Sequence, residues 1–186
     1  MVKGRLFVVS GPSGAGKSTV CKQVRRDLNI NLATSATTRS PREGEENGRE
    51  YYFLTLEEFE KRIKNDEFLE YANVHGNYYG TLKSEADFRL GRGENVVLEI
   101  DVQGGIQIKK RFDDACLVFF KAPTEKILEE RLRGRGTELE ETIQLRLKNS
   151  LKEMAFEDEY DHVIVNETVD KSVLELIEII KKESNQ

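Results

Sequence analysis

An eight-residue segment near the N-terminus contains the residue types that bind phosphate. Residues 11–18 read Gly-Pro-Ser-Gly-Ala-Gly-Lys-Ser and match the pattern G-x-x-x-x-G-K-S. Its glycines allow backbone torsions that turn successive amides toward an anion, and a following helix adds the positive end of its dipole. Lys17 would then reach the β- and γ-phosphates of ATP, and Ser18 is the expected Mg²⁺ ligand. The predicted ATP-binding residues here are Gly11, Pro12, Ser13, Gly14, Ala15, Gly16, Lys17, Ser18 and Thr19.

The neighbours of this loop favour that interpretation. Leu6–Ser10 is a short apolar run rich in Val, which predicts a strand, and Lys17–Leu28 has a helical pattern. A glycine turn with a chance lysine is the alternative. Because strand, glycine-rich loop and helix occur in the order that phosphate binding requires, the sequence favours a phosphate-binding loop, or P-loop.

Apolar runs alternate with helical patterns along much of the chain. The runs at Val96–Ile100, Cys116–Phe120 and Val163–Val165 are nearly continuous in apolar residues, as in strands covered on both faces. Helical patterns occur at Val102–Phe112, Thr124–Arg133 and Val173–Ile180. This alternation predicts an α/β fold of the P-loop NTPase type, with a mainly parallel sheet flanked by helices.

Residues 35–81 differ in composition from the rest of the chain. Arg, Gly, Glu and Asn dominate the first third, and Tyr-rich runs follow at Tyr51–Leu54 and Phe68–Val74. We expect a small, partly antiparallel lobe inserted into the sheet domain. Thr55 and Glu58 have the spacing of a capping box, which predicts a helix to about Asn65.

A second inserted segment is predicted at residues 126–157. Two glycines interrupt a cluster of arginines between Arg131 and Thr137, and Thr137 with Glu140 forms another capping-box pattern. We expect an arginine-bearing lid here. The whole chain, 1–186, would be one domain with a core of residues 1–34, 82–125 and 158–186, a lobe of residues 35–81 and this lid.

Composition argues against several classes of partner. The net charge of −5 over 186 residues, without a basic stripe, argues against nucleic-acid binding. The apolar run Leu6–Val9 is too short for a signal peptide or a membrane span, so we expect a cytoplasmic protein. Neither the cysteines nor the histidines have metal-ligand spacing, so we expect buried thiols and structural or exposed histidines at Cys21, Cys116, His75 and His162.

The chain resembles the guanylate kinase family along nearly its whole length. Besides the P-loop, the matching blocks are residues 35–45, 47–51, 76–81, 98–104, 131–137 and 163–166. The resemblance implies transfer of the γ-phosphoryl group of ATP to GMP. It also implies that Ser35, Glu70, Thr81 and Asp101 contact guanine, and that Arg39, Arg42, Tyr51 and Tyr79 hold the GMP phosphate.

The chemistry of GMP agrees with these implied roles. Guanine presents the N1 and N2 hydrogens as donors, and the Glu70 carboxylate suits that edge, while hydroxyls can serve O6 or N7. Two arginines three residues apart can bind several phosphate oxygens, and phenols add neutral donors. Taken singly, each residue has a structural alternative: Tyr51 and Tyr79 as core aromatics, Glu70 and Arg42 as solvated charges.

Two assignments remain open in the sequence. Glu99 and Asp101 follow the same apolar run and should share a face of the strand, so either carboxylate could support the metal. The resemblance favours Asp101 for the guanine amine. Asn166 matches a family position near the adenine of ATP, with a turn-forming asparagine as the alternative.

The expected mechanism is alignment with charge neutralisation. The second pKa of a phosphate monoester is about 6, so the acceptor is largely ionised at neutral pH and needs no general base. Mg²⁺ is the expected cofactor, and the expected catalytic residues are Lys17, Arg39, Arg131, Arg135 and Arg146.

Two alternatives stay open beside this interpretation. One is a kinase of another small phosphorylated substrate, and the other is a non-catalytic guanylate-kinase-like binding module. The intact P-loop argues against the module, and Ser35, Glu70 and Thr81 argue against another substrate. The expected partners are ATP and GMP, with a monomer or a small homo-oligomer as the assembly.

Overall fold

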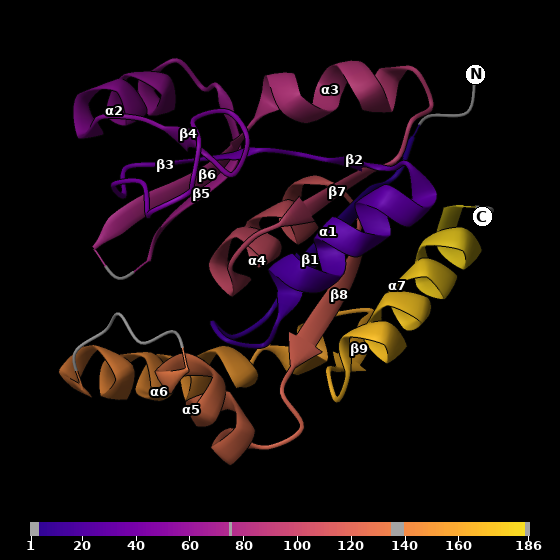
Figure 1. The fold of residues 1–186 in the computed structure, drawn as a ribbon. Helices are drawn as coiled ribbons and strands as arrows, with labels where there is room; N and C mark the ends of the chain where they lie inside the picture. Colours follow the sequence, from indigo (N-terminus) through magenta and orange to yellow (C-terminus); the bar gives the residue numbers. More distant parts are fainter. Residues whose placement is uncertain (1–3, 75, 135–139, 185–186) are drawn as a thin grey trace.

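Two separate β-sheets organise the chain in the computed structural model, which describes residues 4–74, 76–134 and 140–184 (Figure 1). The larger sheet has five parallel strands in the order β2-β7-β1-β8-β9. They are β2 (Asn31–Leu32), β7 (Val96–Glu99), β1 (Leu6–Ser10), β8 (Cys116–Lys121) and β9 (His162–Val165).

The central strand β1 explains why the larger sheet forms. All five of its residues are buried, and Val8 lies beside Leu98 of β7 on one side and Leu117 of β8 on the other. A parallel strand covered on both faces reads as a continuous apolar run, as this one does. The helices must therefore cover both faces of the sheet.

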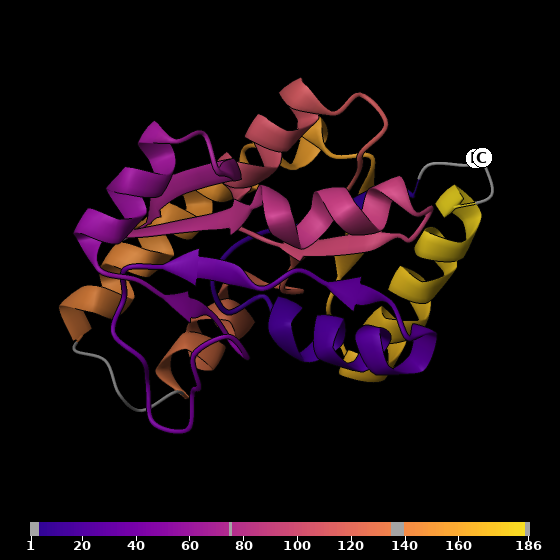
Figure 2. The same cartoon turned by 90° about the horizontal axis from the view of Figure 1, so that it is seen from above.

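Figures 1 and 2 show how the helices are layered. Helices α1 (Lys17–Leu28) and α7 (Val169–Ser184) pack on one face, where Val24 and Leu176 belong to the same core cluster as Phe120. Helices α3 (Lys83–Gly91) and α4 (Val102–Arg111) pack on the other, where Leu90 and Ile108 join a second core cluster. Helices α5 (Glu125–Arg133) and α6 (Glu140–Met154) lie against each other beside the carboxyl ends of the strands, and a short 3-10 turn at Glu157–Glu159 leads to β9.

The smaller sheet has the order β4-β3-β6-β5 and mixed pairing. Its strands are β4 (Tyr52–Phe53), β3 (Ser35–Thr37), β6 (Asn77–Leu82) and β5 (Phe68–Val74). Helix α2 (Leu56–Lys64) buries Phe59, whose ring stacks on those of Phe68 and Tyr78 at 4.4 and 5.3 Å between centroids. These aromatic rings form the small core of this lobe.

The predicted fold class is confirmed by this topology. The structure gives α1 and β5 with the predicted bounds, and Thr55 with Glu58 forms the predicted capping box. Helix α7 is longer than predicted, and the sequence analysis missed α3. The predicted capping residue Thr137 lies outside the described residues. Among the helices that the structure describes, none combines the length and the apolar character needed to cross a bilayer.

The packing of α7 gives a direct test of the core. Leu176 is fully buried against the sheet, whereas Leu174 on the same helix is 64% exposed. Leu176→Ala should lower the free energy of unfolding by about 2–5 kcal/mol, because it leaves a cavity in a close-packed core. Leu174→Ala is the matched control and should change it by less than about 0.5 kcal/mol. Urea unfolding measures both, and equal effects would contradict this assignment of the core.

Candidate active site

The P-loop joins β1 to α1 and depends on two close backbone approaches. Gly11 has φ 139°, and a Cβ there would lie 2.0 Å from the carbonyl oxygen of Phe120. Gly16 has φ 91°, and a Cβ there would lie 2.2 Å from Nδ2 of Asn166. Both positions therefore require glycine for conformation and for space.

Lys17 and Ser18 begin helix α1 and already have polar partners. The Lys17 ammonium donates to the carbonyl oxygens of Gly11, at 2.5 Å, and Pro12, at 3.0 Å. Burial lowers the pKa of Lys17, and the negative charge of Glu99 opposes that shift. The Ser18 hydroxyl donates to Oε1 of Glu99. A cation and a carboxylate–hydroxyl pair therefore stand side by side at the helix N-terminus.

Asn166 supports the P-loop from the end of β9. Its Nδ2 donates to the carbonyl oxygen of Ala15 at 2.7 Å, and its Oδ1 accepts from the Ser172 hydroxyl at 2.9 Å. Arg131 of α5 donates to the Asn166 carbonyl oxygen at 2.9 Å. Asn166 is only 2% exposed, so its side chain forms a buried hydrogen-bonded link between the P-loop and α7.

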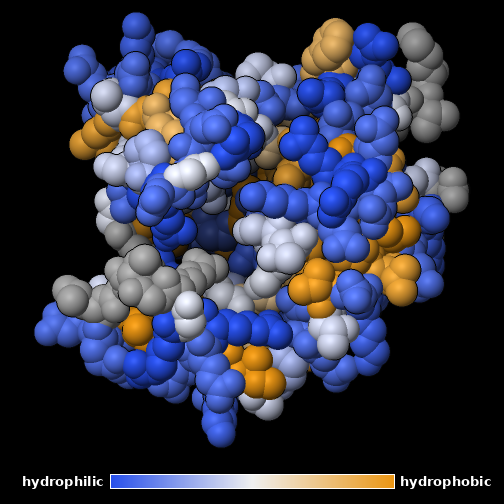
Figure 3. Space-filling view, in the orientation of Figure 1, coloured by the Kyte–Doolittle hydropathy of each residue, from blue (hydrophilic) through white to orange (hydrophobic). Residues whose placement is uncertain are grey.

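A broad cleft opens between the P-loop and the small sheet. Figure 3 shows a hollow with hydrophilic side chains around it on the face in view. The predicted residues that line the cleft are Gly11, Ser13, Gly14, Gly16, Lys17, Ser18, Thr19, Ser35, Arg39, Arg42, Tyr51, Glu70, Tyr79, Asp101 and Arg146. The structure thus brings most residues of both predicted binding groups to one cavity.

Glu70 is the most unusual group in this cleft. It is 0% exposed, and neither carboxylate oxygen has a well-formed hydrogen bond to the described residues. Burial raises the pKa of Glu70 to about 7, and the neighbouring Thr81 moderates the rise. A buried carboxyl group without a well-formed hydrogen bond is a candidate for a ligand contact.

The backbone on either side of Glu70 is tied to helix α4. Arg111 donates to the carbonyl oxygen of Leu69 at 2.6 Å. The Gln107 side chain donates to the Tyr71 carbonyl oxygen at 2.7 Å and accepts from its amide at 3.3 Å. A Cβ on Gly104 of the same helix would lie 2.4 Å from Oε2 of Glu70. Helix α4 therefore fixes the direction of the Glu70 side chain and leaves space for it.

Hydroxyl groups surround the same end of the cleft. The hydroxyls of Ser35 and Thr81 lie 3.4 Å apart and both residues are buried, and of the two only Ser35 lines the cleft. Asp101 caps α4 and accepts from the amide nitrogens of Gln103, at 2.7 Å, and Gly104, at 3.3 Å. Asp101 is thus turned toward α4, whereas Glu99 is bonded to Ser18 of the P-loop.

An arginine and two tyrosines form the outer wall. The Arg39 guanidinium lies 5.5 Å from the centre of the Tyr51 ring, and the Tyr51 and Tyr79 rings meet edge to face at 5.9 Å. Glu45 accepts from Arg39 at 2.9 and 3.0 Å and from the Arg42 amide at 2.7 Å. Burial, with Glu99 nearby, raises the pKa of Tyr51 to about 12, so its phenol is a neutral donor at physiological pH.

Comparison with known proteins identifies the family to which the chain belongs. The family model for guanylate kinase matches residues 3–183. The chain belongs to the guanylate kinase family. It is 63% identical to a guanylate kinase of Fusobacterium nucleatum, covering 97% of this chain and 98% of that one. It is 43% identical to one from Thermotoga maritima, covering 98% and 88%. The crystal structure of the Anaplasma phagocytophilum guanylate kinase has TM-score 0.85 and 29% identity, covering 100% and 88%.

Membership of the guanylate kinase family confirms the predicted resemblance and enzyme class, a nucleoside-monophosphate kinase. Three functional candidates were missed by sequence reasoning: Gly104, Glu45 and Glu153. Gly104 and Glu45 stand inside the matching blocks, but only the fold shows their contacts. Glu153 of α6 lines the cleft, and burial raises its pKa to about 7, with Lys17 opposing the rise.

Three of the predicted ATP residues do not line the cleft. Among the described residues, Pro12, Ala15 and Asn166 are not part of the cleft lining, and the Asn166 side chain donates to the backbone carbonyl oxygen of Ala15 in the loop. Arg131 bonds to the backbone of Asn166, whereas Arg146 lines the cleft. Arg135 lies outside the described residues.

The burial of Glu70 predicts a pH-dependent stability. Its pKa of about 7 in the folded chain exceeds the ordinary value of 4.5, so the folded state holds the proton more tightly than the unfolded state. The resulting stability is present below about pH 4.5 and is lost as the pH rises through 7. Glu70→Gln should therefore be more stable than the unsubstituted, nucleotide-free protein at pH 8, by on the order of 3 kcal/mol. Urea unfolding from pH 5 to 8 measures the difference, and a difference independent of pH would contradict the burial of a charge here.

Proposed function

We propose that this member of the guanylate kinase family transfers the γ-phosphoryl group of ATP to GMP within the cleft between the P-loop and the small sheet. The main support for the proposal is the environment of Glu70. Its buried carboxylate has no well-formed hydrogen bond among the described residues and lies in the same cleft as a P-loop lysine. The guanine edge supplies the two donors that such a group lacks.

The ATP phosphates would occupy the P-loop. The amides of residues 13–19 and the Lys17 ammonium supply positive charge, and Lys17 would exchange its backbone acceptors for phosphate oxygens. Asn166 would act on ATP indirectly, because its bond to the Ala15 carbonyl oxygen holds the loop in shape. Adenine contact by Asn166 stays a prediction from the resemblance.

The oxygen ligands at the start of α1 are of the type that binds a magnesium ion. Hard oxygen donors are what Mg²⁺ prefers, and the Ser18 hydroxyl and the Glu99 carboxylate meet at this point. We therefore assign Ser18 to the ion and Glu99 to its surroundings, in preference to Asp101. When bound, Mg²⁺ would offset the negative charge of the phosphates during transfer.

The guanine of GMP would bind at the α4 end of the cleft. Glu70 would accept from N1 and N2, Asp101 would approach the N2 amine, and the Ser35 and Thr81 hydroxyls would serve O6 or N7. Adenine has a donor in place of O6 and no N2 amine. It would therefore leave Glu70 unpaired, which is a costly arrangement in a buried site.

The phosphate of GMP would bind at the outer wall. Arg39 and Arg42 supply charge, while Tyr51 and Tyr79 supply neutral hydroxyl donors. Arg39 is paired with Glu45 in the nucleotide-free chain. A phosphate dianion would compete with that carboxylate, so Glu45 keeps the guanidinium oriented until the substrate arrives.

The reaction would need alignment rather than a general base. The acceptor oxygen of GMP is already ionised at neutral pH, since its second pKa is about 6. Lys17, Arg39 and the lid arginines Arg131, Arg135 and Arg146 would gather around the transferring group. In this proposal residues 35–81 form the GMP lobe and residues 126–157 the lid, whose closure would exclude water. We further propose a cytoplasmic enzyme that is a monomer or a small homo-oligomer.

A nucleotide panel tests the proposed substrate. With ATP and Mg²⁺ present, GMP should be phosphorylated and AMP, CMP and UMP should give little product. Glu70→Gln should lower kcat/KM for GMP by about 10- to 100-fold, because the amide presents a donor to the guanine donors. The KM for ATP should change less than about threefold, which serves as the internal control. Equal preference for GMP and AMP in the unsubstituted chain would overturn the proposal.

The P-loop lysine gives a second test. Lys17→Ala should lower kcat by at least about 100-fold, because it removes the buried cation that stabilises the charge of the transferring phosphoryl group. Lys171→Ala, at an exposed ion pair with Glu167, is the matched control and should leave kcat unchanged. Steady-state kinetics and a circular dichroism spectrum measure activity and folding together. A folded Lys17→Ala enzyme with near-normal turnover would refute the assignment.

A further inference from the structure

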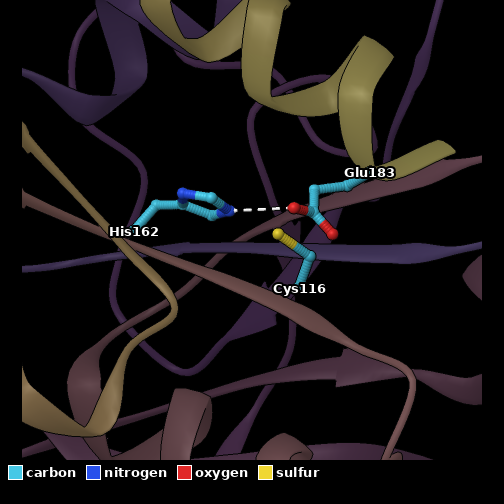
Figure 4. Close-up of side chains that lie close together, drawn as sticks. All are labelled: Cys116, His162 and Glu183. Carbon is cyan, nitrogen blue, oxygen red and sulfur yellow. Dashed lines mark hydrogen bonds and ion pairs between the residues drawn. The ribbon is translucent and has the colours of Figure 1, made fainter. Parts of the chain in front are cut away.

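Three potential metal ligands meet at the edge of the large sheet opposite to the P-loop. The sulfur of Cys116, a ring nitrogen of His162 and a carboxylate oxygen of Glu183 all lie within 4.8 Å of one another (Figure 4). They come from the first residue of β8, the first residue of β9 and the last turn of α7. The P-loop follows the carboxyl end of β1, so this cluster is distinct from the nucleotide cleft.

The strand register explains why these side chains converge. Val118 of β8 lies beside His162 of β9. Because side chains alternate along a strand, Cys116 and Val118 share a face, and His162 lies on that face as well. The same face is covered by α7, whose Ile180 packs in the core cluster of Cys116. Sequence spacing gave no sign of the cluster, since its members are far apart in the chain.

The separation of the nitrogen and oxygen donors is close to that in a tetrahedral metal site, and the sulfur lies within 4.8 Å of both. Nε2 of His162 and Oε1 of Glu183 are 3.2 Å apart. Two nitrogen and oxygen ligands at usual zinc distances would be about 3.4 Å apart, and a sulfur ligand about 3.6 Å from the oxygen. Small rotations of side chains would therefore bring all three atoms to one ion.

Among the described residues, Arg5 contacts one carboxylate oxygen of Glu183, and a surface groove reaches His162. Arg5 binds the other oxygen of Glu183 at 3.0 Å and its carbonyl oxygen at 2.6 Å, so the carboxylate is held with Oε1 toward His162. The guanidinium charge lowers the affinity for a cation, and Asp161 near Cys116 offsets it in part. His162 is 25% exposed and lines a surface groove with Val163 and Ile179, which admits water as a fourth ligand.

We propose that Cys116, His162 and Glu183 form a binding site for a borderline-soft divalent cation, Zn²⁺, which fastens α7 to β8 and β9. One sulfur, one nitrogen and one oxygen donor favour zinc over Mg²⁺, which prefers oxygen alone. Binding forms a bond from zinc to the sulfur and releases the thiol proton to solvent. The hydrogen bond between Nε2 of His162 and Glu183 is lost, and the neutral ring then carries its proton on Nδ1 and donates the Nε2 lone pair to zinc.

The alternative is a buried thiol beside a histidine–carboxylate pair, with no role for a metal. Burial, with Glu183 and Asp161 nearby, raises the pKa of the Cys116 thiol to about 12, so without a cation the sulfur stays protonated. A bound divalent ion deprotonates a coordinating thiol outright. The state of the sulfur in the presence of metal therefore separates the two interpretations.

Cobalt and zinc titrations of the full chain provide the test. Chelator-treated protein without nucleotide is titrated with Co²⁺ and then with Zn²⁺. We expect one equivalent of Co²⁺ to give a thiolate-to-cobalt charge-transfer band and the visible bands of tetrahedral cobalt, both removed by Zn²⁺. Zn²⁺ at about a hundredfold excess over its dissociation constant should raise the Tm by about 5 °C or more.

Three variants assign the site. Cys116→Ser should abolish the charge-transfer band, and His162→Gln should weaken Co²⁺ binding at least about tenfold. Cys21→Ser is the matched control, because Cys21 is the other buried cysteine and should leave the band unchanged. Kinase activity with GMP verifies that each variant is folded. The proposal is overturned if the unsubstituted chain gives no charge-transfer band, or if the band persists in Cys116→Ser.

Discussion

The burial of one carboxyl group, that of Glu70, is the constraint around which the rest of the site is arranged. Burying a carboxylate without hydrogen-bond partners is energetically unfavourable, and specific contacts hold Glu70 in its buried position despite that cost. Gln107 and Arg111 bond the backbone on both sides of Glu70, and the missing side chain of Gly104 leaves it space. The unfavourable burial supports the proposed function, because a ligand with two donors relieves it.

The other half of the site rests on a contact between distant parts of the chain. Asn166, beyond the last strand, holds the Ala15 carbonyl oxygen and is itself bonded to Ser172 of α7. The P-loop is therefore supported by the C-terminal part of the chain as well as by β1. Since β1 lies between β7 and β8, the same sheet positions the P-loop, Glu99 and the start of α4 that carries Asp101.

Local patterns in the sequence predicted much of the fold and the P-loop, whereas the other candidate site residues came from the family resemblance. Strand β1, helix α1 and the capping box of α2 each depend on neighbouring residues, so periodicity and motif spacing were sufficient. Helix α3 was missed because it buries only Ala86 and Leu90, which gives a weak apolar period. Its position depends on packing against β6 and β7, which no local pattern records.

Contacts between residues far apart in the chain could not be predicted from the sequence. The matching blocks include Gly104. Only the structure explains why a glycine is needed there, because a Cβ would come too close to Oε2 of Glu70. The sequence left open whether Glu99 or Asp101 supports the metal, and the hydrogen bond from Ser18 to Glu99 is the basis for proposing Glu99. Strand order places β8 and β9 side by side. The hydrogen bonds of Asn166 and the cluster of Cys116 with His162 follow from that placement.

Guanine should relieve the buried charge of Glu70, and a titration of that single carboxyl group measures whether it does. The side-chain carboxyl signal of Glu70 can be followed by NMR against pH in ¹³C-labelled protein, with Glu70→Gln providing the assignment. We predict a pKa of about 7 without nucleotide and a pKa below the ordinary 4.5 when GMP is bound. A pKa that stays near 7 with GMP bound, or lies near 4.5 without it, would contradict the account.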